Sequence, residues 1–139
     1  EVKYSETMNE PPATMRPRYE ELRGMVGVFR EPAAHALRGN PLQQLWREHM
    51  LSRVMIESGL YDQGRFIVIY PAQNNNCAAA VHAYSTHLAS DDPAVSGFQS
   101  VTLETCLDSF RSIGDDETAT ALHERYLDFG KVETAIFSG

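Results

Sequence analysis

Cysteine is scarce in this sequence of 139 residues, which contains only Cys77 and Cys106. Two cysteines do not form the disulfide framework of a small secreted domain, and these two do not stand at the spacing of a zinc site. Long apolar runs are also missing: no stretch approaches the roughly 20 residues that span a bilayer, and no signal peptide is visible. These absences argue against membrane association and indicate a reducing, cytoplasmic setting for a single domain over residues 1–139.

Several common catalytic signatures are also absent. There is no G-x-S-x-G segment, no glycine-rich phosphate loop and no arrangement typical of a cysteine hydrolase. The five histidines offer no metal site, because His82 and His87 are five residues apart and would rotate off a common helix face. His35, His49 and His123 have no partner at metal spacing, so lone, partly exposed side chains are expected for all five.

Positive charge is nearly missing from the second half of the chain. Residues 66–139 carry three of the twelve basic residues and ten acidic ones, whereas residues 1–65 carry nine of each, and the net charge is −7. This balance argues against a protein that binds nucleic acid by bulk attraction. If any part contacts phosphates, it is the first half, and the acidic second half is expected to be a solvated surface.

Strand and helix signals alternate along the chain and predict an α/β fold. The clearest strand is the apolar run FIVIY at 66–70, which has the composition of a strand covered on both faces. A strand end is also expected at 1–4, and a short strand followed by a helix within 99–114. Further helices are expected at 18–29, 41–59, 72–88 and 115–137, with loops at 5–17, 30–40 and 90–98.

Local signals mark several helix ends. Asn40 and Pro41 predict the start of the helix at 41–59 and Gly59 its end, while the asparagines at 74–76 and Thr102 are expected to cap the helices that follow them. The helix at 41–59 has apolar residues on two sides, which predicts burial between two layers. Its first apolar side contains Leu42, Leu45, Trp46, Met50 and Val54, and its second contains Leu51 and Met55. For the helix after Thr102, the inner face is expected to contain Leu103, Leu107 and Phe110.

The chain begins with EVKYSE, which reads as the end of a strand. In a strand, residues i and i+2 point to the same face, so Glu1 and Lys3 would stand side by side with Val2 turned inward. Phosphodiester hydrolysis with Mg²⁺ needs oxygen ligands for the metal and a cation near the phosphate, and E-x-K supplies one of each. By itself, however, the pattern favours an exposed ion pair of little energetic weight.

Two further segments give this pattern a context. QLWR at 44–47, with His49, lies on the helix expected at 41–59, and Tyr70-Pro71, with Asn74, stands at the end of the clearest strand. Together with EVKY at 1–4, these pieces resemble the PD-(D/E)XK nuclease superfamily, which has the restriction-endonuclease-like fold. More narrowly, they resemble bacterial nuclease-like proteins in which EVKY is followed by a QLWR-x-H helix and a YP-x-x-N strand end.

The resemblance implies a restriction-endonuclease-like mixed sheet flanked by helices and a nuclease that uses Mg²⁺ or Mn²⁺ to act on DNA. Carried over residue by residue, Glu1 is the metal-binding acid and Lys3 the cation that orients the attacking water and stabilises the transition state. Gln44 matches a helix glutamine that approaches the lysine. The superfamily's other acid, usually an aspartate on the preceding strand, has no counterpart here. The sequence is therefore expected to be an N-terminally truncated fragment that does not cut DNA by itself.

Each residue also has a plainer interpretation. Gln44 can serve only to bond a backbone group, and Arg47 can cover apolar surface with its stem instead of binding phosphate. Trp46 is expected in the core. If DNA is the substrate, arginines of the first half should rim the site of Glu1 and Lys3, with the acidic residues 115–117 well away. These arginines are Arg16, Arg18, Arg38 and Arg47.

The sequence leaves three functions open. In the first, the intact protein is a metal-dependent nuclease acting on DNA. In the second, the nuclease-like fold serves as a binding or structural module without catalysis. In the third, the E-x-K pattern is a coincidence and the chain is a helical interaction domain.

Overall fold

The computed structural model of the chain describes residues 8, 14, 17–25, 27–31 and 34–130. The strand expected at 1–4 lies outside these residues. In chain order the described elements are α1 (Pro17–Met25), the short 3₁₀ helix η1 (His35–Arg38), α2 (Gln43–Glu57), β1 (Phe66–Tyr70), α3 (Asn75–Ser85), α4 (Pro93–Ser96), β2 (Phe98–Thr102), α5 (Leu103–Ser112) and α6 (Asp116–Tyr126).

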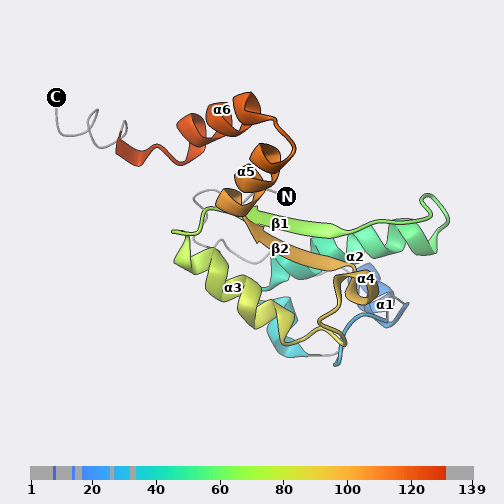
Figure 1. Cartoon of the computed structure of the whole chain (residues 1–139). Helices are drawn as coiled ribbons and strands as arrows, with labels where there is room; N and C mark the ends of the chain where they lie inside the picture. The colour runs from blue at the N-terminus through green and yellow to red at the C-terminus, as the bar shows by residue number, and fades with distance from the viewer. Residues whose placement is uncertain (1–7, 9–13, 15–16, 26, 32–33, 131–139) are drawn as a thin grey trace.

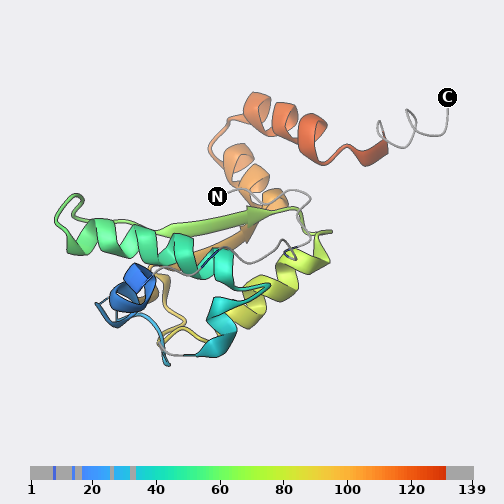
Figure 2. The ribbon, with the colours of Figure 1, turned by 180° about the vertical axis from the view of Figure 1, so that it is seen from behind.

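The two described strands form a parallel pair. Their register runs from Phe66 opposite Phe98 to Tyr70 opposite Thr102. Parallel strands are joined by a crossover, and here α3 and α4 supply it. In Figures 1 and 2, α2 and α3 lie on one side of the strands, and the pair formed by α5 and α6 lies on the other. The predicted α/β class is confirmed.

Two separate cores follow from the alternation of side chains along β1. Phe66 and Val68 point into a large core shared with α2 and α3, whereas Ile69 packs against a smaller core formed by α5 and α6. Apolar residues on both faces of a strand are the reason why FIVIY reads as one continuous run. The small core is centred on Leu103, Leu107 and Ala119, and Phe110 packs against it, so the predicted inner face of α5 is confirmed.

The helix ends confirm most of the local predictions. The side chain of Asn74 accepts a hydrogen bond from the Cys77 amide at 2.9 Å, and that of Thr102 accepts one from the Thr105 amide at 3.2 Å. The prediction for Asn40 is wrong. The amides of residues 42 and 43 both donate to the Gly39 carbonyl, so a turn intervenes and α2 begins only at Gln43.

Four other expectations about helices need correction. The loop expected at 90–98 contains α4, because the Asp92 side chain caps it by accepting from the Ala94 amide. The helix expected at 18–29 ends at Met25, and α6 ends at Tyr126 within the described part of the helix expected at 115–137. Burial of α2 on two sides is also wrong, since Leu51 is 61% exposed and only the side of Leu45 and Trp46 faces the core.

The end of α2 is a Schellman motif, as the glycine in this position predicts. The Gly59 amide donates to the Ile56 carbonyl and the Leu60 amide to the Met55 carbonyl, with Gly59 at φ +74°. A side chain at such a φ meets its own backbone, which is why glycine occupies the position.

Replacing Gly59 with alanine is expected to lower the free energy of unfolding by about 1–2 kcal/mol, as measured by urea denaturation. No atom lies within 4 Å of the added Cβ, so the cost is conformational and not a clash. Gly39→Ala is the matched control, because Gly39 has φ −126° and equally open surroundings. Equal losses in the two variants would contradict the explanation.

No helix in the described part of the chain is long and apolar enough to cross a membrane.

Candidate functional site

Three of the predicted site residues lie outside the described residues: Glu1, Lys3 and Arg16. The predictions that Gln44 points toward Lys3, and that arginines rim the site while residues 115–117 lie away from it, therefore stay predictions. The helix α2, which carries Gln44 and Arg47, is fully described and can be examined residue by residue.

Gln44 lies on the outer side of α2, not between two layers. Its side chain is exposed, and its Nε2 donates to Oε1 of Glu48 one turn later, at 3.0 Å. The other carboxylate oxygen of Glu48, Oε2, is buried and accepts no hydrogen bond. A buried carboxylate oxygen without a donor is unfavourable, and it is the kind of oxygen that a hard cation such as Mg²⁺ binds.

Glu48 was not among the site residues predicted from the sequence. The available signal was its spacing, because residues i and i+4 of a helix are neighbours and Glu48 stands four residues after Gln44. In the described part of the chain, no group of three or more His, Cys, Asp or Glu side chains could hold a metal ion. A metal site therefore needs ligands beyond those of α2, and Glu1 remains the predicted one.

The predicted arginines that the structure describes come from neighbouring elements, since α1 and η1 both pack against α2. Arg18 on α1 is exposed, and its Nη1 donates to Glu21 at 2.8 Å. Arg38 lies at the end of η1 and is half-buried. The helix α1 lies on the opposite side of the strands from α6 (Figures 1 and 2).

Arg47 packs on an aromatic ring, as the plainer of its two interpretations expects, and its binding of phosphate stays a prediction. Its guanidinium lies 5.2 Å from the centre of the Tyr19 ring, and its Nε is buried without a hydrogen-bond partner. Tyr19 in turn meets Trp46 edge to face at 6.2 Å, and Trp46 is fully buried, as predicted. Arg47 thus covers aromatic surface and holds α1 against α2.

His49 contradicts the expectation of a partly exposed side chain, because it is fully buried. Its Nδ1 lies 2.9 Å from the Tyr84 hydroxyl and its Nε2 lies 2.8 Å from the Ser96 carbonyl oxygen. A carbonyl only accepts, so Nε2 carries the hydrogen and Nδ1 accepts from Tyr84. One imidazole therefore joins α2, α3 and the end of α4.

The rings around His49 keep water away from it. Phe29, Phe66 and Phe98 have ring centres 5.8, 6.1 and 5.7 Å from the imidazole. This burial lowers the pKa of His49 to about 4; the Ser96 carbonyl opposes the shift and the charge of Arg53 adds to it. His49 is consequently neutral at physiological pH and serves as a structural connection.

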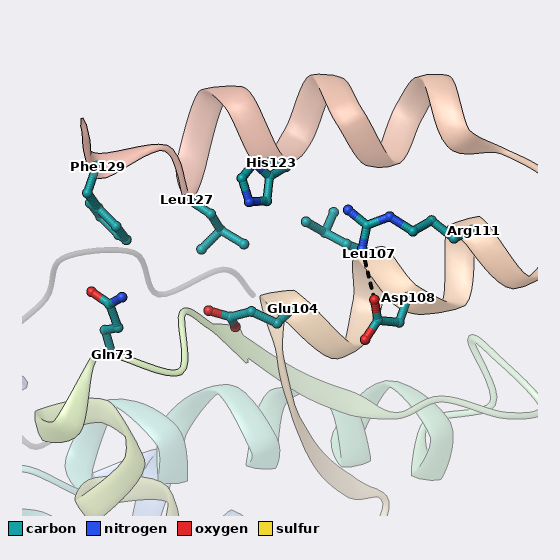
Figure 3. Close-up of a pocket in the computed structure, with 8 residues that line it drawn as sticks. All are labelled: Gln73, Glu104, Leu107, Asp108, Arg111, His123, Leu127 and Phe129. Carbon is teal, nitrogen blue, oxygen red and sulfur yellow. Dashed lines mark hydrogen bonds and ion pairs between the residues drawn. The ribbon is translucent and has the colours of Figure 1, made fainter. Parts of the chain in front are cut away.

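A pocket of about 350 Å³ lies where the two strands end, at the place where open parallel sheets commonly bind ligands. Figure 3 shows Glu104 of α5 and His123 of α6 facing the space between α6 and the loop after β1, which carries Gln73. The Glu104 carboxylate accepts from the Ala72 amide at 3.0 and 3.2 Å, which fixes α5 to that loop. Nearby, Asp108 is paired with Arg111 at 2.8 Å. The acids of this pocket are thus already engaged by the protein.

Comparison with protein families matches residues 1–128 to the model of the PD-(D/E)XK nuclease superfamily. The chain belongs to this superfamily, so the resemblance seen in the EVKY, QLWR and YP segments is confirmed. No curated protein and no solved structure matches the chain.

Proposed function

We propose that this nuclease-like domain belongs to a Mg²⁺-dependent enzyme that hydrolyses phosphodiester bonds of DNA. The observation that carries the proposal is the family match, which begins at the E-x-K segment and includes the whole of α2. Supporting it, α2 presents Gln44 on its outer side beside a carboxylate oxygen of Glu48 that lacks a donor.

In this proposal Glu1 holds the metal, and the orphaned oxygen of Glu48 makes that residue the described side chain best suited to assist. Bound Mg²⁺ would supply Lewis-acid stabilisation of the phosphate and lower the pKa of a coordinated water. The ammonium of Lys3 orients the attacking water and compensates the charge that develops on the phosphate. Gln44 fixes the position of Glu48 through its amide hydrogen bond.

The test is a plasmid-nicking assay on this chain and on the product of its complete open reading frame, with Mg²⁺, Mn²⁺ or EDTA. We expect the product of the open reading frame to cleave in a reaction that depends on the metal and is lost in Lys3→Ala. Cleavage by neither protein would contradict the proposal and favour a nuclease-like binding module. Cleavage that Lys3→Ala leaves unchanged would exclude the E-x-K site.

Gln44→Ala is expected to slow cleavage by the active protein about 10- to 100-fold, the usual effect of removing a residue that orients a metal-site carboxylate. Single-turnover rates measure it. Leu51→Ala is the control, because Leu51 is an exposed residue of the same helix. A rate for Gln44→Ala within about twofold of that control would show that Gln44 plays no part in positioning.

A further inference from the structure

A cavity lined by basic residues lies at the opposite end of the strands from the pocket of Figure 3. This cavity of about 530 Å³ opens between the second half of α2, the loop that leads into β1, and α4. Two arginines line it, Arg53 of α2 and Arg65, which immediately precedes β1. Neither belongs to the arginines that the sequence analysis assigned to DNA binding.

Arg53 is held in place by a close approach to the backbone. A Cβ on Gly97 would lie 3.3 Å from Cδ of Arg53 and 3.4 Å from its Nη1, so the glycine leaves the room that this side chain occupies. The side chain is only 21% exposed, and its Nε is buried without a hydrogen-bond partner. The guanidinium is therefore positioned and largely desolvated before any ligand arrives.

The carboxylates near these arginines do not engage them strongly. The carboxylate of Glu57 is 3.7 Å from Nη2 of Arg53, beyond the distance of a strong hydrogen bond. Within the described residues no carboxylate pairs with Arg65, and the one acid that lines the cavity is Asp62. Two carboxylates, those of Glu57 and Asp62, thus lie near the two guanidinium groups, and in the described residues only that of Glu57 comes within 4 Å of one of them.

We propose that this cavity binds a phosphate group through Arg53 and Arg65. The planar guanidinium offers parallel donors that match the oxygens of a phosphate, and prior fixation of Arg53 reduces the entropy lost on binding. The amide of Gln63, which also lines the cavity, supplies a further donor. The phosphate belongs either to a nucleic-acid backbone or to a free phosphorylated molecule. Binding of a nucleic-acid backbone rests on the proposed function.

The position suits a second contact along a nucleic acid. Arg53 is nine residues after Gln44 on one helix, which places it roughly 14 Å farther along the axis. The two residues also lie on different sides of α2, because Gln44 faces outward while Arg53 lies beside His49 and Gly97. A nucleic-acid strand that contacted both Gln44 and Arg53 would pass around the end of α2.

The experiment uses two probes, inorganic phosphate followed by NMR and fluorescent 20-nucleotide single strands and duplexes followed by anisotropy. We expect phosphate to shift the Arg53 Nε–H and His49 ring signals saturably, and the shifts to disappear in the Arg53→Gln/Arg65→Gln variant. In the same double variant, the affinity for duplex DNA should fall at least fivefold, and the slope of log K against log salt should decrease in magnitude by nearly 2. Arg111→Gln, on α5, is the control that should change neither measurement.

Arg65→Gln alone protects the test against misfolding, because Arg65 is exposed. This variant should lower the salt slope by about 0.9, half of the change in the double variant, without a change in melting temperature. Phosphate shifts with unchanged oligonucleotide affinity would support the site and identify a free phosphorylated ligand. No shift together with unchanged affinity would overturn the inference, even if the protein cleaves DNA. Loss of affinity in a protein that never cleaves would uphold this site and refute the proposed enzyme.

Discussion

Replacing His49 with alanine is expected to lower the free energy of unfolding by about 3–5 kcal/mol. The imidazole is fully buried, so its removal leaves a cavity among the rings of Phe29, Phe66 and Phe98. It also leaves the Tyr84 hydroxyl and the Ser96 carbonyl without their partner inside the core. Urea denaturation followed by circular dichroism measures the loss.

His82→Ala supplies the control, because His82 is exposed on α3 and its replacement should change stability by less than about 0.5 kcal/mol. Tyr84→Phe separates the two causes, since it removes one hydrogen bond and leaves the ring packing in place; a loss of about 1–2 kcal/mol is expected. A loss below about 1 kcal/mol in His49→Ala would refute the structural importance of the imidazole.

Acidification is expected to remove about 3 kcal/mol of stability between pH 6.5 and pH 4 through His49 alone. The pKa of this group falls from 6.5 in the unfolded chain to about 4 in the folded one, because burial disfavours the charged imidazole. Between those values the unfolded state binds more protons, so the stability is complete above pH 6.5 and is lost as the pH falls through about 4. The expected loss of stability is the pKa shift of His49 multiplied by about 1.36 kcal/mol per pKa unit.

The measurement has two parts. An NMR titration should show the His49 ring still neutral at pH 5, and urea denaturation should show lower stability at pH 4.5 than at pH 7. Carboxylates titrate in the same interval, so the ring signal identifies the group responsible. A ring that titrates near pH 6.5 in the folded protein would contradict the burial and both of its hydrogen bonds.

The sequence predicted those parts of the fold that depend on local chemistry. Asn74 and Thr102 were identifiable as caps because the bond each makes lies within three residues of it. The strand at 66–70 was identifiable because both of its faces are covered. The prediction for Asn40 was wrong because the turn at Gly39 delays the start of α2. No local sequence feature distinguishes a helix that starts after Asn40 from one that starts at Gln43.

The surroundings of α2 were less predictable because their contacts are distant in sequence. His49 bonds to Tyr84 and Ser96, which stand 35 and 47 residues away. A partial signal existed, since His49 lies three and four residues from Trp46 and Leu45 and so shares their buried face. Arg53 extends that face by one more turn, yet only the fold brings Gly97 and Arg65 to it.

The division into two cores has a consequence for the dynamics of the molecule. Within the described residues, the core formed by α5 and α6 has three buried side chains, and Ile69 and the Glu104–Ala72 hydrogen bonds connect it to the rest of the protein. Such a unit can open separately while α2 and α3 stay folded. Amide protons of α6 are therefore expected to exchange with deuterium well before those around Trp46. We therefore expect the two helices that wall the pocket of Figure 3 to form the less stable of two folding units.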